Sequence, residues 1–473
     1  MENIQWLQEV ENRKEALFED LFRLLRIESV RDDSQASSEA PVGPGPKAAL
    51  EEFLKMAQED GFQTSQFGPW AGRVEVGKGE ELMGILGHLD VVPAGSGWET
   101  DPFEPQIIND RIYARGSSDD KGPTVAAYFA LKLLKELGVE FNKRVHLIVG
   151  TDEESGWQCM DHYFKEAEMP DFGFSPDATF PIINGEKGNV SAIFKGHDET
   201  ALEGDLELLS FYAGLRANMV PESATAKLLN TGNLNKNDFV KAFDHYLNEK
   251  QVKGSAQVID KEIQLILEGK SAHGSTPEKG VNAATYLADF LSNYRLNRQD
   301  GQDFIGLLSQ ELFDSFDGSK LGVNHHHPIM GEVSMNVGIA NYDSQTGIMI
   351  DANFRFPEGT NPEAMAESIQ AVVVKYPSLS FEMSASKAPH YVPADDPMVE
   401  TLLAVYHDQT GLEAHEQSIG GGTYGRLMPR GVAYGALFPD SIDVMHQANE
   451  FMAIQDLLRA TAIYAEAIYR LTR

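Results

Sequence analysis

Two short, largely apolar runs each end in glycine just before a group of polar side chains. The first covers residues 82–87 and precedes His88, and the second covers residues 145–150 and precedes Asp152. Runs of this length that are bounded by glycine are typical of buried strands in a parallel sheet. Open α/β sheets place their functional residues at the carboxyl ends of such strands. The hydrophobic pattern therefore predicts an α/β domain with polar chemistry at one edge of its sheet.

A helical pattern follows the next acidic motif. Residues 123–137 have the sequence PTVAAYFALKLLKEL, with Pro123 suited to the first turn of a helix and Gly138 to its end. Asp119 lies in the motif GSSDDKG just before this segment. We therefore expect the loop that carries Asp119 to be held between a strand and a helix.

Histidine and acidic residues occur along the chain in an order that suits a metal centre. The set comprises His88, Asp90, Asp119, Glu153, Glu154, Asp177 and His446. Zinc accepts carboxylate and neutral imidazole ligands and keeps a position open for water or substrate. Two such ions roughly 3.5 to 4 Å apart can lower the pKa of a shared water and polarise a carbonyl group. The set is large enough for two ions, with one carboxylate left over as a base.

Consecutive glutamates suit a division of labour between a metal ligand and a base. In the pair Glu153 and Glu154, one side chain can bind a metal ion while its neighbour faces the attacking water. Each motif alone has a simpler explanation: an acidic pair is usually a solvated turn, and Asp119 could be negative charge at the start of a helix. The occurrence of all the motifs together, at strand ends, favours the metal centre.

These motifs resemble those of the co-catalytic zinc amidohydrolases and peptidases, a family that includes acetylornithine deacetylase, succinyl-diaminopimelate desuccinylase, carboxypeptidase G and carnosinase. The resemblance is closest to the bacterial PepV-type dipeptidases and covers essentially the whole chain. It extends to the segments SPDATFP (175–181), NGEKG (184–188), GGGTYGR (420–426) and MHQANE (445–450). The fold that it implies is a zinc-aminopeptidase-like α/β catalytic domain with an inserted α+β lid domain.

The resemblance implies a centre of two zinc ions, with manganese or cobalt as substitutes. Its implied ligands are His88, Asp119, Glu154, Asp177 and His446. Asp119 would bridge the ions, with His88 and Asp177 completing one site and Glu154 and His446 the other. The resemblance also implies that the peptide bond between Asp119 and Asp120 is cis.

Two further acidic residues receive roles from the same resemblance. Glu153 would be the general base, and Asp90 would orient the imidazole of His88 through its second nitrogen.

The position of His446 predicts a divided catalytic domain. His446 lies about 270 residues after Asp177, so the chain must leave the metal-binding domain and return to it. Turn-rich segments at residues 185–188 and 389–393 suggest the limits of an insertion. We expect a first catalytic segment at residues 1–188, a lid at 189–388 and a second catalytic segment at 389–473. The lid is nearly twice as long as in dimeric relatives, which resembles the doubled lid of the PepV-type enzymes and implies a monomer.

Three residues of the predicted lid have the character of substrate contacts. The resemblance makes His273 a donor to the scissile carbonyl oxygen and places Asn218 near the substrate. Arg355 lies in a segment whose apolar residues alternate, which predicts a strand with the guanidinium on its polar face. A guanidinium on a rigid strand suits the C-terminal carboxylate of a peptide. The alternative is a structural ion pair with Asp351.

Two loops complete the candidate residues. The run Gly420 to Gly422 lacks the lysine of a nucleotide-binding loop, so we interpret Gly421, Gly422, Thr423 and Arg426 as lining a substrate pocket. The tract from His325 to His327 has a loop signature and no acidic partner motif, and we expect it at the surface.

Composition and charge limit the classes of partner. The 473 residues include 42% hydrophobic and 23% charged residues, as in ordinary globular proteins. A net charge of −33 argues against nucleic acid or an anionic membrane as a partner. The single cysteine, Cys159, cannot form an internal disulfide, and we expect it to be buried. The N-terminal sequence lacks a basic segment followed by an apolar core, which predicts a cytoplasmic protein.

The predicted function is that of a zinc-dependent dipeptidase acting on unblocked dipeptides, including Xaa-His and β-alanyl dipeptides. A lid that closes on a substrate anchored at both ends would select for dipeptides. An N-acyl amino acid deacylase is the alternative within the same family. A catalytically dead binding protein is the alternative outside enzymes, and the presence of Glu153 with a full ligand set argues against it.

Overall fold

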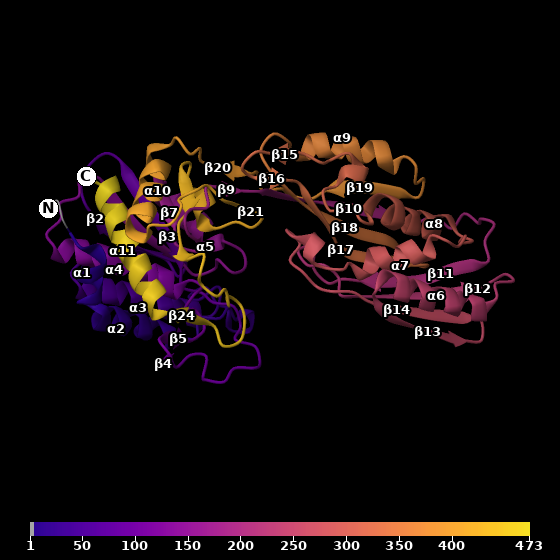
Figure 1. The fold of residues 1–473 in the computed structure, drawn as a ribbon, viewed down its shortest axis with the longest axis horizontal. Helices are drawn as coiled ribbons and strands as arrows, with labels where there is room; N and C mark the ends of the chain where they lie inside the picture. The colour runs from indigo at the N-terminus through magenta and orange to yellow at the C-terminus, as the bar shows by residue number, and fades with distance from the viewer. Residues whose placement is uncertain (1–3) are drawn as a thin grey trace. The chain divides into compact units, whose positions relative to one another are not determined.

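The computed structural model describes residues 4–473, which divide into two compact units. Unit 1 contains the chain up to Gly185 together with Tyr391–Gln417 and Gly422–Arg473. Unit 2 contains Glu186–His390 and the short segment Ser418–Gly421. Figure 1 shows the elements of each unit. The role of unit 2 as a lid stays a prediction.

Unit 1 is built on a six-stranded mixed sheet with the order β1-β2-β6-β3-β7-β22. The strands are β1 (Gln63–Phe67), β2 (Ala71–Val76), β3 (Leu82–His88), β6 (Arg144–Gly150), β7 (Phe172–Ser175) and β22 (Gly431–Ala433). Strands β6, β3, β7 and β22 are parallel, whereas β1 and β2 are antiparallel additions at one edge. The prediction that residues 82–87 and 145–150 form buried parallel strands is confirmed.

Helices cover both faces of this sheet. Those of unit 1 are α1 (Trp6–Glu11), α2 (Lys14–Leu25), α3 (Pro44–Glu59), α4 (Lys121–Glu136), α5 (Gln158–Glu166), α10 (Pro397–Thr410) and α11 (Ile454–Leu471). Successive strand residues point to opposite faces, so Ile85 joins the core under α4 and α11 while Leu86 joins the smaller core under α5. The predicted helix after Asp119 is confirmed as α4, and Gly138 follows it with a φ of 70°.

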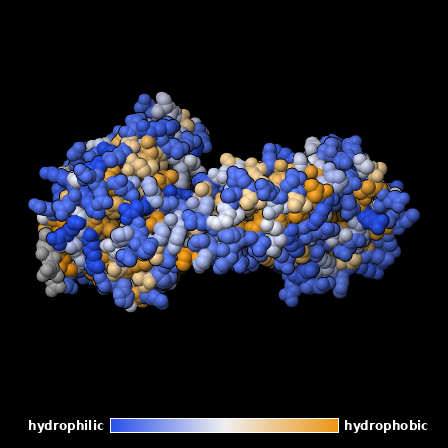
Figure 2. All heavy atoms as spheres, turned by 90° about the horizontal axis from the view of Figure 1, so that it is seen from above, coloured by the Kyte–Doolittle hydropathy of each residue, from blue (hydrophilic) through white to orange (hydrophobic). Residues whose placement is uncertain are grey.

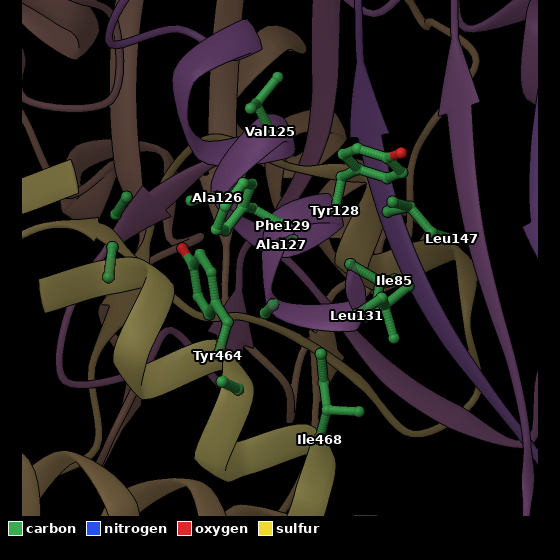
Figure 3. Packing of buried hydrophobic residues seen from close by; sticks show 14 of the residues in the cluster. Ile85, Val125, Ala126, Ala127, Tyr128, Phe129, Leu131, Leu147, Tyr464 and Ile468 are labelled. Carbon is green, nitrogen blue, oxygen red and sulfur yellow. The ribbon is translucent and has the colours of Figure 1, made fainter. Parts of the chain in front are cut away.

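The larger core fixes α4 against the sheet. Figure 3 shows the apolar side chains of α4 together with Ile85 and Leu147 of the sheet and Tyr464 and Ile468 of α11. The side chain of Ile85 and that of Leu147 are fully buried. Because the Asp119 loop runs directly into α4, this packing gives the loop a rigid base.

Short elements complete unit 1. They are β4 (Gln106–Ile108), β5 (Arg111–Tyr113), β8 (Ala178–Thr179), β23 (Ala436–Leu437), β24 (Phe451–Ala453) and the 3-10 turns η1 (Asp33–Gln35) and η5 (Tyr424–Leu427). Strand β24 pairs with β5, which brings the C-terminal segment beside the stretch that precedes Asp119. The chain changes unit at the short strands β9 (Gly185–Glu186), β20 (His390–Tyr391) and β21 (Ser418–Ile419).

Unit 2 contains an eight-stranded antiparallel sheet with the order β13-β14-β12-β11-β17-β18-β10-β19. The strands are β10 (Gly188–Gly196), β11 (Leu206–Ala213), β12 (Ser223–Asn230), β13 (Lys253–Ile259), β14 (Glu262–Glu268), β17 (Ser334–Asp343), β18 (Gly347–Phe356) and β19 (Leu379–Met383). The sheet consists of two four-stranded halves that meet where β11 pairs with β17.

One face of the unit 2 sheet carries the helices. They are α6 (Lys236–Lys250), α7 (Ala283–Leu291), α8 (Gln299–Gly306) and α9 (Pro362–Val373), with the π-helix η3 (Leu307–Leu312) and the 3-10 turns η2 (Pro277–Lys279) and η4 (Ser319–Leu321). A single core joins these helices to alternate residues of the strands, including Phe354. Arg355, the next residue of β18, therefore lies on the opposite face, as its sequence pattern predicted.

Figure 2 shows mostly hydrophilic residues on the visible face, with small apolar patches between them. Cys159 is buried, as expected. Among residues 4–473, none of the helices combines the length and the apolar character that a membrane span requires. The first residues of the chain, on which the expectation of a cytoplasmic protein partly depends, lie outside the described range.

Candidate metal centre

Three neighbouring strands of unit 1 bring acidic and histidine side chains to the same edge of the sheet. His88 is the last residue of β3, Glu153 and Glu154 follow β6, and Asp177 follows β7. Strand β3 lies between β6 and β7, so the three strand ends are adjacent. Parallel strands end at one edge, which explains why residues far apart in sequence meet here.

Asp119 lies between two imidazoles. Its Oδ1 is 3.1 Å from Nε2 of His88, and its Oδ2 is 2.9 Å from Nε2 of His446. The two oxygens of one carboxylate thus face two different histidines. This is the arrangement that a carboxylate bridging two metal ions requires, and it agrees with the role implied by the sequence.

The other predicted ligands lie around these two imidazoles. Nε2 of His88 is 3.7 Å from Oδ2 of Asp177, and Nε2 of His446 is 3.2 Å from Oε2 of Glu154. Two groups of side chains each offer ligand atoms that all lie within 4.8 Å of one another. One group is His88 with Glu153 and Asp177, and the other is His88 with Asp119 and Glu154. The structure therefore gathers all five predicted ligands, and it also brings the carboxylate of Glu153 to the same place.

Asp90 lies beside the second nitrogen of the His88 imidazole, and its role in orienting that ring stays a prediction. Nδ1 of His88 is 2.9 Å from the backbone carbonyl oxygen of Asp90 and 3.5 Å from its carboxylate. The carboxylate also accepts the backbone N–H groups of Glu153 and Glu154, each at 3.1 Å. Asp90 thus lies beside the imidazole with both its carbonyl and its carboxylate, and its side chain also fixes the turn that carries the glutamate pair.

The peptide bond between Asp119 and Asp120 is cis, as the resemblance implied. The side chain of Asp120 turns away from the imidazoles: its Oδ2 accepts the hydroxyl of Thr124 at 2.7 Å and the backbone N–H of His88 at 3.1 Å. These bonds tie the first turn of α4 to the end of β3, so the loop and the strand hold one another in place.

Burial and crowding of like charges shift the acidities of the centre. Burial, together with the neighbouring carboxylates, raises the pKa of Glu153 to about 8. The pKa of Asp177 is raised by the same causes. Hydrogen bonds to Asp119 and Glu154 raise the pKa of His446 to about 10. An excess of buried carboxylates over cationic groups is the environment that divalent cations stabilise.

The donor set fits a pair of divalent metal ions. Two imidazoles and three carboxylates are hard or borderline donors, and neutral histidine with carboxylate is a ligand combination that zinc accepts. The two oxygens of Asp119, each directed at one imidazole, provide the bridge that a pair of sites needs. The residues present are therefore compatible with the two-ion centre implied by the sequence.

A second group of predicted residues meets within unit 2. The backbone of Met219 forms a β-bridge with that of His273, and the N–H of Gly274 donates to the carbonyl oxygen of Asn218 at 2.7 Å. Burial lowers the pKa of His273, and the nearby charge of Arg355 lowers it further. Asn218, His273 and Arg355 thus belong to one cluster on unit 2, although their contacts with substrate stay predictions.

Asn336 was missed by the sequence reasoning. This buried side chain on β17 donates to the carbonyl oxygens of Ala217 and Met219, at 2.8 and 3.0 Å, on either side of Asn218. Gly338 permits the close approach, since a Cβ there would lie 2.4 Å from the carbonyl oxygen of Ala217. No local pattern marks Asn336, because its role depends on a loop more than 100 residues earlier.

The glycine-rich loop is divided between the units. Gly421 belongs to unit 2, and Gly422, Thr423 and Arg426 belong to unit 1. The hydroxyl oxygen of Thr423 accepts the N–H of Gly425 at 3.1 Å and so starts η5. The ring of Tyr424 lies edge-on to that of His88, with centroids 6.4 Å apart. This segment therefore borders the candidate metal centre, while its contacts with substrate stay predictions.

The histidine tract lies in a hairpin on unit 2. His326 and His327 form the two-residue strand β15, which pairs with β16 (Gly331–Glu332). His326 is exposed, and its Nδ1 is 4.0 Å from the carboxylate of Glu332. Among the described residues, no cluster of metal-ligand atoms includes this tract.

Comparison with known proteins identifies a peptidase family and a relative of nearly the same length. The model of the family described as "Peptidase family M20/M25/M40" matches residues 84–470. A protein of Staphylococcus haemolyticus, named provisionally as a dipeptidase, is 45% identical over 470 residues, which cover 98% of this chain and 99% of the relative.

Solved structures agree on the fold. Aminopeptidase PepT of Bacillus cereus matches with a TM-score of 0.57 and 15% identity, covering 97% of this chain and 99% of its own. Human carnosine dipeptidase 1 matches with a TM-score of 0.54 and 15% identity, covering 99% of this chain and 98% of its own. At these identities the likeness concerns the fold alone.

Proposed function

Because the chain belongs to peptidase family M20/M25/M40 and is thus a peptide hydrolase, we propose that it is a dipeptidase activated by two zinc ions. Manganese or cobalt are the proposed substitutes. The substrates would be unblocked dipeptides, including Xaa-His and β-alanyl dipeptides. The observation that carries the proposal is the position of Asp119, whose two carboxylate oxygens face His88 and His446.

The proposed chemistry divides between the metal centre and the base. His88 and Asp177 would hold one ion, Glu154 and His446 the other, and Asp119 both. When bound, the ions would supply Lewis acidity toward water and the scissile carbonyl. Glu153 takes a proton from the attacking water and returns it to the leaving amine. Burial raises the pKa of the Glu153 carboxyl, which favours its acting as a proton acceptor and donor.

Substrate recognition is assigned to the cluster on unit 2 and to the glycine-rich loop. In this proposal His273 donates to the carbonyl oxygen that gains negative charge, and Arg355 binds the C-terminal carboxylate. Asn218 lies beside the substrate, and the pocket is completed by Gly421, Gly422, Thr423 and Arg426. Unit 2 acts as a lid, so that a substrate must be short enough to be held at both ends.

A substrate panel tests this function. Purified protein is supplied with zinc or manganese and assayed against Ala-His, β-Ala-His, Leu-Leu, a tripeptide and N-acetylornithine. We expect cleavage of the dipeptides only. Hydrolysis of N-acetylornithine alone would instead assign the chain as a deacylase, and metal binding without turnover of any compound would identify a binding protein.

The same proposal predicts a monomer that acts in the cytoplasm. If the long inserted unit brings His273 to the metal centre of its own chain, no second subunit is needed. Light scattering should then give a mass near that of one chain, 52.2 kDa. Mixing His273→Ala with Glu153→Ala chains tests the point further, because restored activity would mean that subunits share the histidine.

A further inference from the structure

We propose that Glu450 is a positioning residue of the candidate metal centre, holding the Asp119 loop against the segment that carries His446. The inference rests on the proposed function, because it concerns the same centre. Glu450 comes four residues after His446, and its carboxylate accepts from backbone N–H groups and from Arg115. Its effect would be exerted through the backbone of the loop.

The carboxylate of Glu450 is fully buried and accepts four hydrogen bonds. Its Oε1 accepts the backbone N–H groups of Ser118 and Asp119, at 2.8 and 3.1 Å. Its Oε2 accepts the backbone N–H of Gly116 at 3.1 Å and Nη1 of Arg115 at 2.6 Å. Three of these donors are backbone N–H groups of the loop itself, so a single side chain satisfies three main-chain donors of the loop.

These bonds constrain the orientation of Asp119. Its N–H points to Glu450, while its carboxylate oxygens face His88 on one side and His446 on the other. A buried carboxylate that accepts several backbone N–H groups holds that backbone more firmly than hydrogen bonds to water would. The bond from its N–H to Glu450 therefore holds the backbone of Asp119 so that its carboxylate faces both imidazoles, as a bridging ligand needs.

Further contacts join the two segments around this point. Arg115 is buried, and its Nη2 reaches the carbonyl oxygens of Pro93 and Ala94 at 3.3 and 3.4 Å. The N–H of Ala114 donates to the carbonyl oxygen of Glu450 at 3.2 Å. Glu450 thus ties together two stretches that are more than 330 residues apart and that each supply a predicted ligand.

A purely structural clamp would have a different signature from a positioning residue. Loss of a structural clamp lowers the stability of the protein but leaves the affinity for metal ions unchanged once the chain is folded. Loss of a positioning residue lowers that affinity, because the bridging carboxylate is no longer held in place. Residues that support metal ligands from behind typically change metal affinity by about 10- to 100-fold.

The test compares two glutamine variants of buried glutamates. In Glu450→Gln the amide group must place an NH2 against one of the donors that the carboxylate accepted. Glu466→Gln is the matched control: Glu466 is also buried in unit 1 and accepts from Arg470 and Gln409, but it lies on α11 and contacts no predicted ligand. Metal-free protein of each kind is titrated with zinc in competition with a chelating dye, and its Tm is measured without metal.

We expect Glu450→Gln to weaken zinc binding by about 10- to 100-fold, while Glu466→Gln lowers only the Tm. Zinc affinity within about twofold of the unchanged protein, together with a lowered Tm, would overturn the inference. If Glu450→Gln does not fold, Glu450→Asp takes its place. This variant keeps the negative charge, but its shorter side chain cannot maintain the same bonds to the loop backbone, so unchanged zinc affinity would likewise count against the role.

The affinity measurement is independent of the proposed reaction. If the unchanged protein binds zinc but cleaves no dipeptide, the proposed function fails while the comparison of affinities still decides the role of Glu450. If the dipeptides are cleaved and Glu450→Gln binds zinc normally, only this inference fails.

Discussion

Replacing Glu153 with alanine is expected to lower kcat on Ala-His by about 100- to 10,000-fold, the usual contribution of a general base. The carboxylate would no longer accept the proton of the attacking water. Metal content should stay at two ions per chain, because the predicted ligands all remain. The measurement pairs steady-state kinetics with metal analysis of the same sample.

The neighbouring glutamate supplies the control. Glu154→Ala removes a predicted ligand, which lies 3.2 Å from Nε2 of His446, and should lose metal as well as activity. The comparison is informative because the carboxylate of Glu153 also lies within 4.8 Å of the ligand atoms of His88 and Asp177. If the Glu153 variant retained less than one ion per chain, the roles of the two glutamates would have to be exchanged.

The turn that carries the glutamate pair explains why neighbours can differ in role. Both N–H groups of the pair donate to the carboxylate of Asp90, so the backbone presents its two side chains in fixed directions. One oxygen atom of Asp90 serves each residue. In the proposed mechanism, the distinction between a ligand and a base would therefore depend on a third carboxylate, which accepts both N–H groups of the turn and also lies 3.5 Å from Nδ1 of His88.

The parts of the fold that the sequence predicts are those governed by local patterns. The runs before His88 and Asp152 are apolar because β3 and β6 are buried on both faces, and α4 keeps its helical pattern because it packs on that sheet. Three of the predicted ligands, His88, Glu154 and Asp177, lie at or just after parallel strands that end at one edge, whereas the full ligand set was implied by the family resemblance. The antiparallel edge strands β1 and β2 carry no comparable signal, because most of their residues are exposed or only partly buried.

The residues that support the site could not be predicted in this way. Glu450 and Asn336 act by hydrogen bonds to backbone groups of distant loops, and no spacing along the chain marks which backbone a side chain will meet. Asp90 was identified from the sequence, but the hydrogen bonds of its carboxylate to the turn of Glu153 and Glu154 were not predicted. Side-chain chemistry suggested the ligands, whereas their supports depend on the completed tertiary fold.

Replacing Arg355 with alanine is expected to lower kcat/KM on Ala-His by the equivalent of about 2 to 5 kcal/mol, because a partly buried charge loses its partner. Strand β18 holds Arg355 rigidly, since its register pairs this residue with Asn189 on one side and Ser334 on the other. Burial lowers the pKa of His273, and the positive charge of Arg355 lowers this pKa further. Both observations place the guanidinium in the unit 2 cluster.

The amide of the same dipeptide separates recognition from structure. Ala-His amide has no terminal carboxylate, so a guanidinium that binds this group contributes nothing to its hydrolysis. The penalty of Arg355→Ala should therefore be large on Ala-His and vanish on the amide, with each variant compared to the unchanged protein. Equal penalties on the two substrates would mean that Arg355 has a structural role, such as an ion pair with Asp351. The carboxylate would then have to be bound elsewhere, and Arg426→Ala would be the next variant to compare on the same two substrates.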